Sequence, residues 1–391
     1  MKRYRVQEII NHDEILTGME LLIDGDRIAD IHQSSGTASG ESYRYAIPGF
    51  IDMHTHGGSG FDVMDATLES LSGIARFHLS QGTTSFCASI LSAPLSMLKS
   101  VLQEGESFIT HNRESASQGT EASCLGFHLE GPWLSPDNAG AHSREHIISP
   151  DRESFDLIAR FSDIISIVTL SYNRESNPFL QHLTEHGIIA AAGHDDTADF
   201  EILKGFGRGI SQVTHLYSCT STFRRHDGKK HLGTLEMALM TDGIAVEVIA
   251  DGHHITKFFW NFIRHNKMLD DIVLVSDSIK GAGLEKDAGR MTIGDRDIII
   301  DGGVAWTSNR TLFAGSVTTM HRMLLILVTE WGESLQDAVR VTSHNQARIL
   351  GLSGTLGRIA PGMIADILFM DEDLAIKKIV KSGKEFAFSK E

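Results

Sequence analysis

The sequence has few of the features that mark secreted, membrane or nucleic-acid-binding proteins. Its 391 residues include three cysteines, Cys87, Cys124 and Cys219, which are too few and too far apart for a disulfide framework. The N-terminus has no apolar signal-peptide core, and no apolar run approaches the roughly 18 residues that cross a bilayer. The formal net charge is −16, which disfavours nucleic acid and anionic membranes as partners. We therefore expect a cytoplasmic protein that binds neither nucleic acid nor membrane.

The middle of the chain alternates short apolar runs with amphipathic helical stretches. Eight runs are typical of buried strands: 47–56, 83–90, 125–130, 164–170, 188–193, 212–216, 244–250 and 272–277. Helical periodicity appears between most of them, for example at 67–80, 94–106, 151–161, 197–206 and 255–266. Eight strand–helix units predict an α/β fold, a closed (β/α)8 TIM-like barrel. The alternative is an open doubly wound sheet, which is disfavoured because no Gly-rich phosphate motif opens the first helix.

Both ends of the chain contain strand-and-turn material instead. Residues 21–31 predict a hairpin that turns at Asp24-Gly25 or Gly25-Asp26, and strands recur near 364–370 and 379–384. Neither end is large enough to bury a core alone. We therefore predict two parts: a small β-sandwich from 1–47 plus 357–391, and the barrel from 48–356.

Polar side chains follow most of the predicted barrel strands. The first strand ends in His54-Thr55-His56, whose two imidazoles share one face because residues i and i+2 of a strand point the same way. The glycines that follow, Gly57 and Gly58, permit a tight turn with close backbone approach. Other strands are followed by Glu130, His194, His215, the run 251–254 and Asp277. A barrel brings these strand ends to one face.

Four histidines and a carboxylate are a suitable donor set for two divalent metals. Glu130 is placed to bridge the two ions, with His54 and His56 on one, and His194 and His215 on the other. A bound metal lowers the pKa of coordinated water to about 7, which provides hydroxide at neutral pH. Asp277 is then free to accept the proton of the water and return it to a leaving amine. This arrangement predicts hydrolysis of an amide or related bond.

The same stretches resemble the N-acetylglucosamine-6-phosphate deacetylase family of the amidohydrolase superfamily. The resemblance covers nearly the whole chain, at 48–58, 127–136, 140–142, 193–194, 214–217, 249–254, 274–277, 312–316 and 357–366. The most specific of these is His-Leu-Glu-Gly-Pro-Trp at 128–133, whereas the last stretch marks only the superfamily.

The resemblance implies roles for individual residues. Glu130, His194 and His215 match the ligands of the principal metal, and His54 and His56 match members that hold a second one. It also implies that Asp277 is the catalytic base and then acid, and that the sugar and its acetamide are contacted by His142 and His254. The expected cofactor is one or two divalent ions per subunit, with zinc favoured over iron, manganese or cobalt. The expected substrate is N-acetylglucosamine 6-phosphate or a close N-acetyl amino-sugar phosphate, and the expected assembly is a homodimer.

The chain departs from the family after His215, the histidine at the end of the sixth predicted strand, in the segment where family members bind the phosphate. The family's usual Asn and Ala are replaced by Ser218 and Cys219, whose backbone N–H groups remain candidates for binding an oxyanion. The family's arginine turn is replaced by a basic cluster, from which we select Arg225 as the phosphate ligand, since arginine suits bidentate phosphate binding. The resemblance also implies that an arginine of one subunit reaches the phosphate site of the other.

Two other readings stay open at this stage. The first is another amidohydrolase reaction, on N-acyl-D-amino acids, dipeptides or cyclic amides. Many such enzymes bridge their metals with a carboxylated lysine after strand four, but 164–173 contains no lysine, which leaves that role to Glu130. The second is a binding protein that has kept the fold. Such a protein is expected to have lost ligands or Asp277, and none of them is missing.

Overall fold

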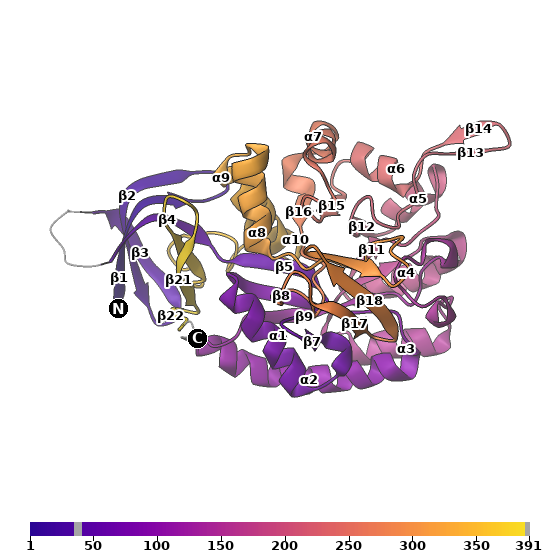
Figure 1. The fold of residues 1–391 in the computed structure, drawn as a ribbon, viewed down its shortest axis with the longest axis horizontal. Helices are drawn as coiled ribbons and strands as arrows, with labels where there is room; N and C mark the ends of the chain where they lie inside the picture. Colours follow the sequence, from indigo (N-terminus) through magenta and orange to yellow (C-terminus); the bar gives the residue numbers. More distant parts are fainter. Residues whose placement is uncertain (35–40, 388–391) are drawn as a thin grey trace.

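The computed structural model describes residues 1–34 and 41–387. Residues 35–40 and 388–391, which the prediction assigned to the terminal domain, lie outside the described residues. Figure 1 shows a sheet built from the two chain ends beside a larger body of strands surrounded by helices. The division into two parts follows the predicted pattern, and the bounds 1–47 plus 357–391 and 48–356 stay a prediction.

The larger body is an eight-stranded parallel barrel. Its strands are β5 (Phe50–Thr55), β8 (Thr83–Ile90), β9 (Ser123–Glu130), β10 (Ile165–Leu170), β11 (Ile189–Ala192), β12 (Ile210–Val213), β15 (Ala245–Val248) and β16 (Ile272–Leu274), neighbours in that order. Backbone bonds bring the first strand and the last together: the His56 N–H donates to the Ser278 carbonyl at 2.8 Å, and the Asp277 N–H to the His54 carbonyl at 2.9 Å. The predicted barrel is confirmed, and the open doubly wound sheet is excluded.

Helices cover the outside of the barrel. They are α1 (Leu68–Ser80), α2 (Leu95–Ser117), α3 (Arg152–Phe161), α4 (Asn177–Glu185), α5 (Phe200–Phe206), α6 (Thr234–Met240), α7 (Lys257–Asn266), α8 (Met320–Leu325), α9 (Leu335–Val339) and α10 (Asn345–Ile349). The last three are joined by the π-helical stretches η6 (Ile326–Trp331) and η7 (Arg340–His344). Short 3-10 turns are η1 (Val63–Asp65), η2 (Pro136–Asn138), η3 (Arg144–His146), η4 (Arg174–Ser176) and η5 (Leu269–Asp271). In the described ranges, no helix combines the length and the apolar character that crossing a membrane requires.

The five helices predicted as examples are confirmed, but α2 ends at Ser117 instead of near residue 106. Its buried stripe continues at helical spacing through Phe108, Asn112 and Ala116. The polar Asn112 hides this periodicity in the sequence. Its amide is satisfied in the fold, where it donates to the Ala122 carbonyl at 2.9 Å and accepts from the Cys124 N–H at 2.7 Å.

The barrel interior is packed rather than hollow below the strand ends. One cluster of buried side chains fills it, made of Met53, Cys87, Ile167, Ala191, Ile249 and Val275. The three cysteines are free thiols, as their spacing predicted. Because these side chains fill the interior, the open space on the barrel axis in the described structure lies at the C-terminal ends of the strands.

Strands from both termini form one seven-stranded sheet, in the order β22-β21-β20-β4-β1-β2-β3. Its members are β1 (Lys2–Ile10), β2 (Ile15–Asp24), β3 (Arg27–Gln33), β4 (Ser42–Pro48), β20 (Ile367–Met370), β21 (Ile376–Lys381) and β22 (Lys384–Glu385). The predicted hairpin turns at Gly25-Asp26, where Gly25 has a φ of +61°, which favours glycine. The predicted association of the two ends is therefore confirmed, with β4 leading directly into barrel strand β5.

Three small sheets were not predicted. A three-stranded antiparallel sheet follows the last barrel strand, formed by β17 (Gly289–Ile293), β18 (Arg296–Asp301) and β19 (Val304–Thr307). A hairpin of β13 (Arg224–His226) and β14 (Lys229–His231) projects away from the barrel at the upper right of Figure 1. The third is the pair β6 (Gly57–Gly58) and β7 (Phe61–Asp62), beside the first histidines. Here a Cβ on Gly57 would lie 2.3 Å from the Phe61 carbonyl oxygen, so the predicted close approach is real.

Candidate metal centre and active site

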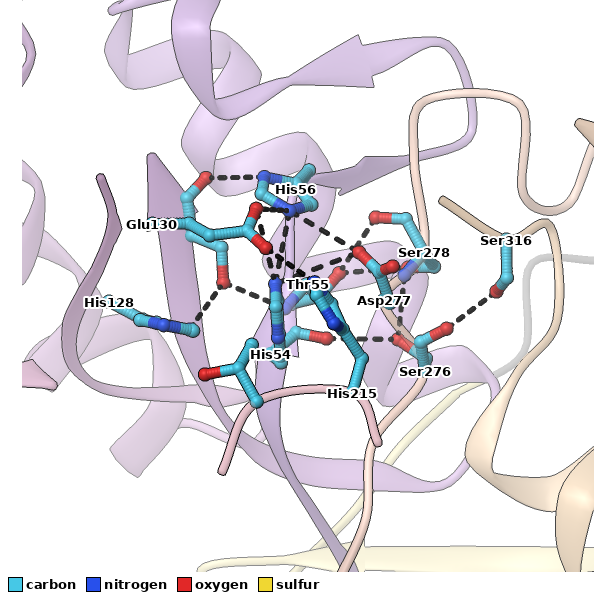
Figure 2. A network of polar contacts seen from close by, with 12 residues as sticks. His54, Thr55, His56, His128, Glu130, His215, Ser276, Asp277, Ser278 and Ser316 are labelled. Carbon is cyan, nitrogen blue, oxygen red and sulfur yellow. Dashed lines mark hydrogen bonds and ion pairs between the residues drawn. The ribbon is translucent and has the colours of Figure 1, made fainter. Parts of the chain in front are cut away.

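A pocket opens at the C-terminal ends of the barrel strands. Its floor is formed by His56, Glu130, His194, His215 and Asp277, and its walls include His142, His254, Tyr217, Ser218, Cys219, Phe313 and the β17–β18 residues Ile293, Arg296 and Ile298. Figure 2 shows the carboxylates of Glu130 and Asp277 directed toward His54 and His56 from different strands. The structure thus brings together all six residues that the strand ends predicted for metal binding and proton transfer.

The carboxylate of Glu130 lies between two groups of histidines. Its Oε1 is 3.1 Å from Nε2 of His194 and 2.7 Å from Nε2 of His215. Its Oε2 faces the other way, 3.2 Å from Nε2 of His56 and 3.3 Å from Nε2 of His142. One oxygen per group is the arrangement that a bridging carboxylate requires.

On the Oε2 side, the candidate metal ligands are His54, His56 and Asp277. The two Nε2 atoms are 3.1 Å apart, and Asp277 Oδ1 lies 3.3 Å from that of His56 and 3.6 Å from that of His54. Within this group, and within the group of Glu130, His194 and His215, the donor atoms all lie within 4.8 Å of one another. Two nitrogens on one tetrahedral zinc ion are about 3.3 Å apart, so both groups have the dimensions of a metal site.

The imidazoles are held so that their Nε2 atoms converge. The Nδ1 atom of His56 lies 3.2 Å from the Ser89 carbonyl, and that of His194 lies 2.9 Å from the Asn138 carbonyl. Each ring must donate its Nδ1–H there, because a carbonyl only accepts. Each Nε2 is then the nitrogen aimed at the centre, and once it gives up its proton it has the lone pair of a metal ligand. The residues present therefore fit a divalent metal.

The electrostatics of the site depend on these close pairs. Burial alone would raise the pKa of Asp277, but the neighbouring His54 and His56 lower it to about 2. Burial alone would lower the pKa of His56, but Asp277 and Glu130 raise it to about 9. Asp277 is therefore a carboxylate at neutral pH. A cation that binds here must displace protons from the histidines, so its affinity rises with pH.

Three of these residues lie in the left-handed region of backbone conformation. The φ angles are +48° for His194, +26° for His215 and +47° for Asp277. Such conformations cost about 1–3 kcal/mol for non-glycine residues and concentrate at functional sites. Here each one turns the chain sharply at a strand end, so that the side chain points into the pocket.

Comparisons with known proteins agree with this geometry. The family model "Amidohydrolase family" matches residues 45–388. The N-acetylglucosamine-6-phosphate deacetylase of Bacillus subtilis is 32% identical over 88% of this chain and 85% of its own.

The chain belongs to the amidohydrolase family.

It is a hydrolase of amide bonds, and within the family its relatives are amino-sugar-phosphate deacetylases. The N-acetylgalactosamine-6-phosphate deacetylase of Escherichia coli O157:H7 is 28% identical over 98% of this chain and 99% of its own. A Mycobacterium smegmatis N-acetyl-D-glucosamine-6-phosphate deacetylase variant, solved with N-acetyl-D-glucosamine-6-phosphate, superposes with a TM-score of 0.88 at 26% identity, covering 98% of each chain. Amidohydrolases generally use a divalent metal, which agrees with the two donor groups.

This amidohydrolase places both predicted sugar-contacting histidines in the pocket wall. The Ser92 N–H donates to Nδ1 of His142 at 3.3 Å, so the ring proton of His142 is on Nε2, facing the Glu130 carboxylate. Burial lowers the pKa of His142 to about 4, so it is a neutral donor. His254 is oriented by Asp251, whose carboxylate lies 2.8 Å from its Nδ1.

The predicted phosphate residues do not all meet in one pocket. Ser218 and Cys219 are in the wall, although the Ser218 N–H already donates to the His215 carbonyl at 2.9 Å. Arg225 is on the exposed hairpin β13–β14 and does not line the pocket. The predictions for these three residues stay untested by the structure.

Sequence reasoning missed two charged residues of this amidohydrolase. Arg296, at the start of β18, is the one arginine or lysine in the described part of the chain that lines the pocket. Its guanidinium donates to the carbonyls of Ala141 and His142, each at 3.3 Å. Glu247, in the middle of β15, is fully buried beneath His54. No motif marks either residue, because each depends on which strands become neighbours.

Proposed function

We propose that this amidohydrolase removes the acetyl group of N-acetylglucosamine 6-phosphate, or of a close N-acetyl amino-sugar phosphate, and yields acetate and the amino-sugar phosphate. The observation that carries the proposal is the Glu130 carboxylate between two histidine groups, with the ionised Asp277 beside it in a pocket. The activities named for the relatives from B. subtilis and E. coli supply the substrate class.

Glu130, His194 and His215 would hold the principal divalent ion, and His54 and His56 a second one. When bound, the ion lowers the pKa of a coordinated water and polarises the acetamide carbonyl. Zinc is favoured by the nitrogen-rich donor set, with iron, manganese and cobalt as alternatives.

Asp277 moves the proton in this proposal. Its carboxylate oxygen Oδ1, 3.3 Å from Nε2 of His56, accepts a proton from the attacking water. The water oxygen bonds to the acetamide carbonyl carbon, and the same Asp277 oxygen then returns the proton to the amine nitrogen as the C–N bond breaks. A neutral amine and acetic acid leave, and the acid releases the second water proton to solvent to become acetate. His142 supplies a neutral N–H at the pocket wall, and His254 a second ring, to position the acetamide and the sugar.

We infer further that the enzyme acts as a homodimer in which Arg225 binds the phosphate of the neighbouring subunit. The hairpin that carries Arg225 projects from the barrel, and Arg225 does not line the pocket of the chain it belongs to (Figure 1). An exposed aromatic face adjoins the pocket through Tyr217, formed by Phe258, Phe259 and Phe262 of α7, and Phe258 is 87% exposed. Apolar faces of this kind mark protein interfaces.

Subunit complementation tests the role of Arg225. In R225Q, KM for the phosphorylated substrate is expected to rise about 10- to 100-fold, the value of one hydrogen bond between charged groups. R224Q, one residue away on the same strand, is the matched control and should behave as wild type. Mixed dimers of R225Q and D277N should regain activity, since the R225Q subunit keeps Asp277 and receives Arg225 from its partner.

Two results would contradict this assignment. Mixed dimers that stay as inactive as the parents would show that Arg225 does not act across the interface. A rise in KM for R296Q, with none for R225Q, would assign the phosphate to Arg296 within one subunit.

The proposed reaction is tested by acetate release from enzyme reconstituted with zinc. The substrates are N-acetylglucosamine and N-acetylgalactosamine, each with and without the 6-phosphate, beside an N-acyl-D-amino acid and a dipeptide. We expect the phosphorylated sugars to be hydrolysed with the highest kcat/KM. If none of the sugars releases acetate, the deacetylase proposal is wrong; equal rates with and without phosphate would remove the phosphate from the proposal.

A further inference from the structure

Glu247 is a buried carboxylate that the reaction described above does not use. It lies in β15, is 0% exposed and does not line the pocket. Three N–H groups surround it. Its Oε2 lies 3.0 Å from Nδ1 of His54 and accepts the His215 backbone N–H at 3.1 Å, and its Oε1 accepts from the Gln212 amide at 2.5 Å. Both oxygens of the Glu247 carboxylate are thus used as hydrogen-bond acceptors.

The contact with His54 sets the state of that ring. Because the carboxylate accepts, Nδ1 of His54 carries a proton, which leaves Nε2, 3.1 Å from Nε2 of His56, as the ring nitrogen that can bind a metal. A carboxylate behind a ligand histidine fixes its tautomer and raises its basicity. His56 and His194 rest on neutral backbone carbonyls instead. Among the four histidines of the metal centre, His54 alone is backed by a carboxylate in the described structure.

Glu247 also connects the two donor groups. One oxygen, Oε2, accepts from the ring of His54 in the first group and from the backbone of His215 in the second. Its other oxygen is fixed by Gln212, a neighbour on the adjacent strand β12. The carboxylate thus cannot turn without giving up a hydrogen bond to a buried N–H, which would leave that donor unpaired.

A ligand role for Glu247 itself is the alternative. Its carboxylate, His54 and His128 bring three donor atoms within 4.8 Å of one another. However, Nε2 of His128 is 2.8 Å from the Thr169 hydroxyl and Nδ1 is 3.3 Å from that of Ser89. Both ring nitrogens are therefore already in hydrogen bonds, and the group is complete without an ion.

We propose that Glu247 is a positioning residue that strengthens metal binding by His54, and so decides whether the group of His54, His56 and Asp277 takes up a second ion. The inference rests on the metal centre of the proposed function but not on its substrate. Metal binding is measured without any sugar, so a failure of the deacetylase proposal leaves this test intact.

The test is zinc stoichiometry and affinity in E247Q, measured by elemental analysis and by competition with a chelating indicator. Glutamine keeps the size but removes the charge and one acceptor. We expect wild type to bind two zinc ions per chain. In E247Q the weaker ion should bind about 10- to 100-fold less tightly, the usual effect of losing such a partner, with the other ion unchanged. E121Q is the matched control, since Glu121 is equally buried but contacts Arg76 and Asn112 far from the site.

A double-mutant cycle separates positioning from general damage. H54Q removes the ligand through which Glu247 acts, so E247Q should have no further effect on zinc affinity in that background. E247D, which keeps the charge but draws it back by one methylene, is expected to fall between wild type and E247Q, and serves if E247Q does not fold. The proposal is overturned if wild type binds only one zinc ion, or if E247Q binds zinc with unchanged affinity. It is also overturned if E247Q weakens both ions equally, or if the effects of H54Q and E247Q on zinc affinity are additive.

Discussion

Replacement of Asp277 with asparagine is expected to reduce kcat for deacetylation by about 10²- to 10⁴-fold, the usual contribution of a general acid–base residue. Asparagine has the same shape but cannot accept the proton of the attacking water. The side chain should stay in place, because the Asp277 N–H donates to the His54 carbonyl at 2.9 Å and its carbonyl accepts from the Ser316 N–H at 2.8 Å. The loss should therefore report on proton transfer and not on folding.

The measurement pairs kcat with metal content. The ion held by Glu130, His194 and His215 should be retained in D277N, since Asp277 is not part of that group. D271N is the matched control: Asp271 lies where β16 begins, at the opposite end of the barrel, and accepts the Gly243 N–H at 2.9 Å. The kcat of D271N should match that of wild type. If D277N turned over within about tenfold of wild type, Asp277 would not be the proton carrier.

The barrel and the floor of its pocket were predictable because a parallel barrel has one chemical face. Each apolar run became a strand, and a polar residue at the end of a strand or shortly beyond it, such as Glu130 or Asp277, has nowhere to lie except the common end. His54 and His56 were also predictable, since their spacing matches the period of the strand. These inferences needed only the order of the elements.

The part of the pocket wall formed by β17 and β18 was not predictable in this way. The segment 289–307 has apolar residues at alternate positions, such as Ile298 and Ile300, between short turns. That pattern indicates a small sheet but not which surface it covers. Its placement brings Ile293, Ile298 and Arg296 into the pocket wall, and this depends on packing between segments far apart in the sequence.

Glu247 shows a second limit. A single carboxylate in an apolar strand usually indicates a solvent-facing position. In a barrel the other face of the strand is also buried, so Glu247 is satisfied by His54 from β5 and Gln212 from β12. Its partners follow from the register between strands, and no local pattern in the sequence encodes that register.

The loss of metal in E130Q is expected to be the most complete effect of a single substitution in this enzyme. Glu130 is 2% exposed, and its charge lies within 3.3 Å of four imidazole rings, those of His56, His142, His194 and His215. Without that charge, Asp277 is the one carboxylate left beside the Nε2 atoms, and Glu247 lies behind His54 on its Nδ1 side. We expect zinc to fall below one ion per chain and kcat/KM to fall by about a thousandfold or more, since a catalytic metal supplies several kcal/mol of barrier reduction.

Chelation and reloading make the prediction specific. Wild type treated with a chelator should lose activity and regain it with zinc, whereas E130Q should regain neither zinc nor activity. E20Q is the control, because Glu20 is also buried but pairs with Arg3 in the terminal sheet.

The two oxygens of Glu130 face different histidines. If the carboxylate bridges the two ions, E130Q should weaken the binding of both ions together. Loss of only one ion in E130Q would assign Glu130 to a single metal and leave the other to His54, His56 and Asp277 alone.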